Sequence, residues 1–331
     1  MVSLFLRKNL YDLCNLINFP YSSLNTLPDL SHFTEESVLK YLNSKADFKS
    51  QWNKKNNIII SDFKFSFKYR IIEQNSKLLK LRLSITDSFI LNPDINKIIS
   101  SSIDDYILIA EYSKNHNIKI YALISKEEDT LLYCFLNANN LDTIDDFLPI
   151  RQYDIWNADS KILDSLLNKI QSLYYHFSPR KVKENSKFNI ENACNYAERF
   201  ALVPNPEYIS FEKSGGDCTN FASQIIHAGG INTTYTWKPY SNAWLRVEEL
   251  YSYLINNKLA YKAPDDSYLS RGVLIQFGTP KLGRFFHTGF ITHELINGEF
   301  LYCCHSYNKL NYPLSNIYPI LYPQLRSLHF I

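Results

Sequence analysis

Apolar and polar residues alternate over two stretches in the first half of the chain. Between positions 63 and 70, aromatic residues occupy the odd positions and charged or polar residues the even ones, and 81–85 repeats the alternation. A period of two places apolar side chains on one face of a strand, so both stretches are predicted strands with one covered face. Further strands are predicted over 106–112, 118–125 and 131–136. One-sided alternation of this kind favours an antiparallel sheet.

Other stretches place apolar residues three and four positions apart, which is the spacing of an amphipathic helix. Residues 1–19 predict a short helix that covers the sheet. Thr34 is expected to cap a second helix, and 162–173 predicts a third, capped by Asn157 or Asp159. Turns at 115–117 and at the charged stretch 127–129 are expected to close hairpins.

The second half of the chain places predicted helices before predicted strands. The helices are expected over 189–202, from Cys218 to the glycine pair at 229–230, and over 244–255. The strands are expected over 272–277, 286–292, 300–305 and 325–331. This order is typical of the α+β class. A polar linker at 181–188 then separates an N-terminal α+β domain of unknown role (1–180) from a C-terminal domain (189–331).

The composition is that of a globular protein. The chain has 331 residues, which suggests two domains, with 45% hydrophobic and 21% charged residues. These values exclude a wholly disordered, collagen-like or coiled-coil chain. A formal net charge of +2 gives no indication of a nucleic-acid or acidic-lipid partner. Residues 1–180 contain no glycine-rich phosphate loop, metal motif or recognisable pair of carboxylates.

The sequence also bears on location. No apolar run reaches the roughly 18 residues that span a membrane. The apolar stretch at 4–6 is short and is followed by Arg7 and Lys8, so no secretory signal is expected. The six cysteines form no CxxC pair, which favours free thiols in a reducing compartment. We therefore expect a cytoplasmic protein, with export by another route left open, and the sequence does not indicate an oligomeric state.

Cys218 is the strongest candidate for chemistry. It follows Gly215, Gly216 and Asp217 at the predicted start of a helix. Unpaired backbone N–H groups and the positive end of the helix dipole favour the thiolate at such a position. The two glycines allow a sharp turn and the close approach of a substrate. Asp217 is expected to cap the helix with its carboxylate, because a carboxylate beside the thiolate would otherwise raise the thiol pKa.

A thiolate nucleophile needs a histidine that takes and returns a proton. His227 lies too far along the helix of the cysteine. His287 begins a predicted strand, where Gly289 on the same face leaves space beside the imidazole. His305 ends the following strand, so a hairpin would bring it near His287. His305 and Asn308 are both candidates for the group that orients the base.

Each of these residues also has a purely structural interpretation. A cysteine at a helix start is more often a small buried residue, and a strand histidine is more often packed in a core. Cys303 and Cys304 are strand neighbours, for which burial is favoured over a vicinal redox pair. A zinc site formed by Cys303, His305 and His293 would lack the usual ligand spacing, so neither a metal nor a cofactor is expected.

An ordered set of motifs runs through the second half of the chain. It consists of Phe188-Asn189, Ala193, Tyr196-Ala197, Asn205-Pro206-Glu207-Tyr208, Phe211, the run from Gly215 to Gln224 and Ala228-Gly229-Gly230, with Trp244, 272–277, 287–292 and His305-Ser306 downstream. This set resembles the putative amidase domain family, which is common in Gram-positive bacteria. That family is similar to papain-like cysteine peptidases, including the CHAP amidases. The resemblance covers about 189–331 and does not extend to 1–180.

The resemblance implies a papain-like domain with Cys218 as nucleophile and His287 as general base. By analogy with the Cys-His-His sites of related peptidases, His305 would be the third, orienting residue. Two positions depart from the family. Members often have Gly-Asp at 272–273, where this chain has Gly-Val, and Asp at 308, where it has Asn308. Position 308 therefore supplies no carboxylate, although an amide can still orient an imidazole.

The implied mechanism is acyl transfer without a cofactor. The Cys218 thiolate attacks an amide carbonyl, and His287 protonates the leaving amine and then activates water. Backbone N–H groups at the helix start, that of Cys218 included, would stabilise the oxyanion, and Tyr208 would add a hydroxyl. We expect a cysteine amidase or peptidase that acts on a peptide, with peptidoglycan-type peptides as the first candidates. The rival is a binding protein that keeps the papain-like shell without turnover, with an N-terminal domain that recognises a partner.

Overall fold

The computed structural model describes residues 2–22, 26–91, 97–112, 118–144, 156, 159–175, 188–212, 214–264, 269–295 and 298–331. The chain divides into two compact units. The first comprises Met1–Ile98 and Ile103–Leu163, and the second comprises Ile99–Ser102 and Asp164–Ile331. Both units combine helices with antiparallel strands, so the predicted α+β class is confirmed.

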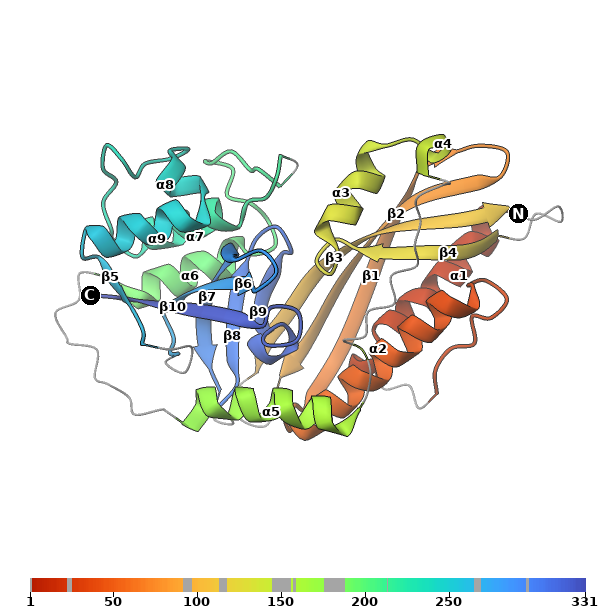
Figure 1. The fold of residues 1–331 in the computed structure, drawn as a ribbon, viewed down its shortest axis with the longest axis horizontal. Coiled ribbons are helices and arrows are strands. Elements are labelled where there is room, and N and C mark those ends of the chain that lie inside the picture. Colours follow the sequence, from red (N-terminus) through yellow and green to blue (C-terminus); the bar gives the residue numbers. More distant parts are fainter. Residues whose placement is uncertain are drawn as a thin grey trace. The chain divides into compact units, whose positions relative to one another are not determined.

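The first unit is built on four long strands. They are β1 (Ile60–Gln74), β2 (Leu78–Leu91), β3 (Ile98–Tyr112) and β4 (Ile118–Ser125). The strands lie in this order, with antiparallel pairing of β1 with β2 and of β3 with β4 (Figure 1). The alternation predicted for 63–70 is confirmed, because the odd positions are half-buried and the even ones exposed.

Helices α1 (Val2–Ile17) and α2 (Glu36–Lys55) cover one face of this sheet, with the short 3-10 helix η1 (Phe19–Tyr21) between them. Leu10 of α1 and Leu42 of α2 share a buried cluster with Leu81 and Leu108 of the strands. The expectation that the first helix covers the sheet is therefore confirmed. The second helix begins one residue later than expected, with Glu35 rather than Thr34 at its N-cap position.

The prediction of a strand over 131–136 is wrong. These residues belong to helix α3 (Thr130–Ala138), which is followed by α4 (Leu141–Ile144). The Asp129 carboxylate accepts a hydrogen bond from the Leu132 N–H, so the charged stretch read as a hairpin turn is the N-cap of a helix. Tyr133 of α3 is buried in a cluster with residues of β2, β3 and β4. The turn expected at 115–117 lies outside the described residues.

The helices of the second unit largely follow the predicted spacing. They are α5 (Ser160–Tyr175, whose first turn is counted with the first unit), α6 (Ile190–Phe200), α7 (Cys218–Ala228), α8 (Asn242–Leu245) and α9 (Val247–Asn256). Asp159 precedes α5 and accepts from the Lys161 N–H, whereas the alternative cap, Asn157, lies outside the described residues. The single helix expected over 244–255 is interrupted at Arg246, which has an extended conformation.

The strands of the second unit are all antiparallel. In order across the sheet they are β9 (Lys309–Pro313), β8 (Phe300–Cys304), β7 (Arg284–Glu294), β6 (Leu274–Thr279), β10 (Gln324–Phe330) and β5 (Ala260–Lys262). Ser101 and Ser102, which belong to this unit, pair with β9, and the 3-10 helix η3 (Leu314–Asn316) follows it. Strands β5 and β9, of three and five residues, were not predicted.

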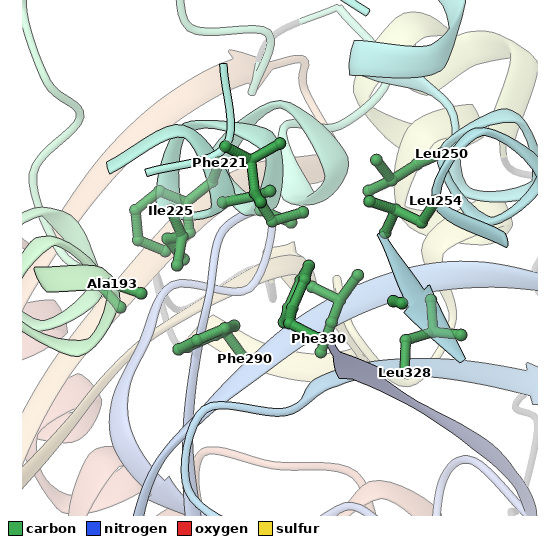
Figure 2. Close-up of a cluster of buried hydrophobic side chains, with 14 of the residues drawn as sticks. Ala193, Phe221, Ile225, Leu250, Leu254, Phe290, Leu328 and Phe330 are labelled. Carbon is green, nitrogen blue, oxygen red and sulfur yellow. The ribbon is translucent and has the colours of Figure 1, made fainter. Parts of the chain in front are cut away.

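Helix α7 is held on this sheet by a hydrophobic core. Phe221 and Ile225 of α7 share the core with Phe290 of β7 and Phe330 of β10 (Figure 2). Fully burying each of these side chains contributes about 1.5–3 kcal/mol to the free energy of unfolding. The packing fixes the axis of α7, and with it the place of Cys218 at the N-terminal end of the helix.

The expected linker and the absence of a membrane-spanning segment are two further predictions for the chain. All of the expected linker at 181–188 except Phe188 lies outside the described residues, so the proposed domain boundary stays a prediction. Within the described ranges, none of the helices combines the length and the hydropathy that crossing a membrane requires.

Candidate active site

The loop before Cys218 turns sharply into α7. Gly215 and Gly216 have φ angles of +112° and +120°, a conformation that L side chains rarely adopt. A Cβ atom at Gly216 would lie 3.2 Å from the Ser306 Oγ. Position 216 therefore requires glycine both for its backbone conformation and for the close approach of Ser306. Cys218 itself is partly exposed.

Ser306 caps α7. Its Oγ accepts hydrogen bonds from the Asp217 N–H at 2.8 Å and from the Cys218 N–H at 3.2 Å. The prediction that the Asp217 carboxylate caps the helix is wrong, because Asp217 holds the N-cap position without a side-chain cap bond. Sequence reasoning noticed Ser306 only as part of a family motif, since the bonded groups lie nearly ninety positions apart along the chain.

The Asp217 carboxylate does not cap the backbone of α7, and both of its oxygens have other hydrogen-bond partners. It accepts hydrogen bonds from the Phe211 N–H at 2.8 Å and from the Asn220 Nδ2 at 2.8 Å. Its other oxygen lies 2.7 Å from the Nδ1 of His305. A buried carboxylate is costly unless it is hydrogen-bonded or paired, and these partners supply that compensation. Asp217 thus ties the loop before α7 to the turn after β8.

His305 is anchored on both sides of its ring. Besides the contact with Asp217, its Nε2 lies 2.7 Å from the Phe200 carbonyl oxygen. The ring stacks on Phe221 of α7, with centroids 3.8 Å apart. Because both nitrogens are engaged, His305 has none left with which to orient His287. The structure therefore does not bring these two histidines together in the predicted way.

His287 lies on β7 in an aromatic surrounding. Its ring centroid is 5.6 Å from that of Phe277, 5.0 Å from that of Tyr307 and 5.9 Å from that of Tyr322. The side chain is 2% exposed, and the Nε2 has no hydrogen-bond partner among the described residues. Burial, with a smaller effect from the positive charge of Lys309, lowers the pKa of His287 to about 3. The imidazole is therefore neutral at physiological pH and able to accept a proton.

The neighbours of His287 along β7 define where its ring lies. The Thr288 Oγ1 is 3.4 Å from the Thr219 Oγ1, so the Thr288 side chain points at α7. Successive side chains of a strand point to opposite faces, which places the His287 ring on the other face. The space expected beside it at Gly289 is not open, because a Cβ there would lie 2.8 Å from the Tyr302 ring.

Four donors surround the sulfur of Cys218. The Thr219 Oγ1 lies 3.7 Å from the Sγ. Hydrogen bonding from the backbone of Thr219 and Thr288 and from the Ser306 side chain also acts to lower the Cys218 pKa. Burial of the thiol is nevertheless the largest effect, and it raises the Cys218 pKa. The expected lowering of this pKa is thus absent, because the loss of hydration outweighs the donors.

Two further candidates lie close to these residues. The Asn308 Oδ1 is buried without a hydrogen-bond partner among the described residues, and Asn308 directly follows Tyr307, which contacts the His287 ring. Tyr208 stacks on Trp244 with centroids 6.0 Å apart, and Trp244 in turn donates to the Asn220 Oδ1 in the first turn of α7. The Tyr208 hydroxyl makes no hydrogen bond within the described part of the chain.

The residues considered for a zinc site have separate partners. His293 is bonded to Glu198, and the Cys303 Sγ lies 3.7 Å from the Asn311 Oδ1. Cys303 and Cys304 are both buried. In the described ranges, no three His, Cys, Asp or Glu side chains are grouped so that they could hold a metal ion.

A family comparison covers the part of the chain that contains this site. Residues 187–324 match the model of the family described as "Putative amidase domain". This match confirms the resemblance to that family that the motifs predicted. The described loop, helix α7 and strands β6–β9 all lie within the matched region. The match supports an amidase-like hydrolase as the general class.

Two curated relatives come from Bacillus subtilis (strain 168). The uncharacterized protein YjcM is 32% identical over 130 residues, which cover 37% of this chain and 31% of YjcM. The uncharacterized protein YhbB is 33% identical over 109 residues, which cover 29% of this chain and 34% of YhbB. The chain thus spans about a third of the length of these relatives, whose names assign no activity. No solved structure matches the chain.

Proposed function

We propose that the protein is a cysteine-dependent amidase or peptidase that cleaves an amide bond through an acyl-enzyme on Cys218. The observation that carries this proposal is the placement of the Cys218 sulfur. It lies at the start of α7 among donors from Thr219, Thr288 and Ser306. The Thr288 amide belongs to the peptide unit that follows His287, but the His287 ring lies on the face of β7 opposite to the Thr288 side chain, so proton transfer requires the ring to turn towards the sulfur. A papain-like assignment of the domain rests on the same arrangement.

His287 is the proposed base. Its neutral imidazole takes the thiol proton as the sulfur bonds to the amide carbonyl carbon. The resulting imidazolium then gives that proton to the leaving amine as the C–N bond breaks. His287 next removes a proton from water, which attacks the thioester, and the thiol and carboxylic acid are released. Burial lowers the pKa of His287, so its imidazole accepts a proton only weakly in the substrate-free protein. We therefore expect substrate binding to change the surroundings of the imidazole so that its pKa rises.

Asn308 is the proposed orienting residue, in preference to His305. Both nitrogens of His305 are engaged by Asp217 and Phe200, whereas the Asn308 Oδ1 is a buried acceptor without a partner among the described residues. An imidazole N–H is the donor that such an acceptor suits. Tyr208 is the proposed oxyanion donor, since the Cys218 N–H already donates to Ser306.

Peptidoglycan-type peptides are the proposed first substrates, on the strength of the family resemblance. A second candidate function is a binding protein that keeps the domain without turnover. The raised pKa of Cys218 and the burial of His287 favour that alternative, because an unactivated thiol and an enclosed base are expected in a site that has lost its catalytic activity.

The test uses the full chain with a mixture of soluble peptidoglycan peptides, with products followed by mass spectrometry. We expect new amine and carboxylate termini with the wild type, and their loss in Cys218→Ala and in His287→Ala. Cys134→Ala is the matched control, because Cys134 is an exposed cysteine on α3 outside the family match. Undiminished turnover by Cys218→Ala would refute the mechanism. Binding of the peptides by the wild type without any cleavage would support the second candidate.

A further inference from the structure

The Ser306 hydroxyl accepts two hydrogen bonds from backbone N–H groups and keeps its own O–H as a donor. A serine hydroxyl has two acceptor lone pairs and one O–H donor. The Asp217 N–H and the Cys218 N–H take the two acceptor positions, at 2.8 Å and 3.2 Å. The O–H donor then remains, next to the residue that carries the sulfur, and hydrogen bonding from Ser306 is among the effects that lower the Cys218 pKa. The two backbone amides therefore determine the direction in which the O–H points.

The backbone at Ser306 is held in an unusual conformation. Its φ is +75°, in the left-handed region that favours glycine, and Ser306 is not glycine. Such strain persists where the surrounding structure imposes it, and it is concentrated at functional sites. The neighbours supply that constraint. His305 is fixed by Asp217, Phe200 and Phe221, and Gly216 leaves just enough room for the Ser306 Oγ.

We propose that Ser306 is a positioning residue for the Cys218 nucleophile, whose hydroxyl is aimed at the sulfur by the two N–H groups at the start of α7. A glycine at this position would relieve the backbone conformation but would remove the hydroxyl. The donor stabilises the thiolate more than the thiol, and so partly offsets the effect of burying the sulfur. His305 acts in the same assembly by fixing the turn that carries Ser306.

The titratable groups around the sulfur come from three segments. Asp217 lies in the loop before α7, His305 in the turn after β8, and His287 on β7. The Asp217 carboxylate and the His305 ring are bonded to each other, and that contact does not involve the Ser306 hydroxyl. A change in the thiol pKa in such a variant therefore reports on the hydroxyl itself.

This inference rests on Cys218 as the proposed nucleophile, but its test needs no substrate. The rate of alkylation of Cys218 by iodoacetamide is measured against pH, resolved by mass spectrometry, in the full chain. The variants are Ser306→Ala, which keeps the Cβ and the backbone strain, and Ser306→Gly, which removes both. Ser210→Ala is the control, because Ser210 is exposed in the loop before α7 and its Oγ accepts only from the nearby Glu212 N–H at 3.4 Å.

We expect the labelling midpoint to rise by about one pH unit in both Ser306 variants, a tenfold smaller thiolate fraction at a fixed pH, and to stay at the wild-type value in Ser210→Ala. Thermal unfolding identifies which variant remains folded. A wild-type midpoint in a folded Ser306→Gly or Ser306→Ala protein would overturn the inference. So would a shift in one variant that the other, equally folded, does not share. A shift without any amidase activity would leave this inference standing and refute the proposed function.

Discussion

The buried imidazole of His287 predicts how the stability of the second unit depends on pH. Folding lowers the pKa of His287 from the ordinary value of 6.5 to about 3. Below pH 6.5 the unfolded chain therefore binds a proton that the folded unit does not. By linkage, the stability that the neutral ring contributes is fully present above pH 6.5 and is lost as the pH falls towards 3. His287→Phe should remove this pH dependence of stability, because the new ring fills the same aromatic surroundings but cannot be protonated.

The magnitude follows from the shift. A difference of 3.5 pKa units (6.5 minus 3) corresponds to about 5 kcal/mol once the pH lies below both values. At pH 5.5, one unit below the ordinary value, the expected loss is about 1.4 kcal/mol relative to pH 7.5. We therefore expect the free energy of unfolding to fall on acidification by about 1.4 kcal/mol more in the wild type than in His287→Phe.

Amide hydrogen exchange in peptides of β6, β7 and β8, measured at increasing urea concentration, reports the stability of this unit at each pH. The buried Glu299 also titrates in this range, because burial raises its pKa to about 7. Its effect is the same in both proteins and cancels in the difference between them. His227→Gln shows what the loss of another histidine of the unit does. Equal pH dependence of the wild type and His287→Phe would refute the enclosed, neutral imidazole on which the proposed base depends.

Two more predictions concern stability in the second unit. Glu299→Gln should remove a pH dependence of opposite sign. The stability that protonated Glu299 contributes is fully present below pH 4.5 and is lost as the pH rises through 7, so this contribution should fall by about 1.3 kcal/mol between pH 6 and 8, measured by the same exchange experiment. Gly216→Ala should lower the melting temperature more than Gly215→Ala, because both positions have positive φ but only a Cβ at 216 approaches Ser306, and equal losses would show that this contact carries no cost.

Patterns between neighbours in the sequence predicted most of the helices and strands. The alternation at 63–70 indicated β1, and the glycine pairs on either side of α7 indicated its limits, because both signals arise from residues in the same element. The apolar run at 131–136 was assigned to a strand, since a short apolar run fits either element. The Asp129 cap decides for the helix there.

The arrangement around Cys218 was less predictable. The sequence indicated Cys218 and His287, because the residue types carry the chemistry and the family motif includes both. It did not indicate that Ser306 would cap α7, or that Asp217 would bind His305. Those bonds join the start of α7 to a turn that follows β8, and their geometry depends on how the helix packs on the sheet.

The turn after β8 gives a structural reason for a motif to which the resemblance assigned the orientation of the base. His305 was expected to orient the base, yet its ring is bonded to Asp217 and Phe200 and stacked on Phe221. Those contacts fix the residue that follows it, Ser306, whose hydroxyl accepts from the N–H groups of Asp217 and Cys218. The pair His305-Ser306 therefore holds the backbone of the proposed nucleophile through one anchoring ring and one hydroxyl. The orienting role is therefore proposed for a different part of the same turn, where the Asn308 Oδ1 is buried without a partner among the described residues.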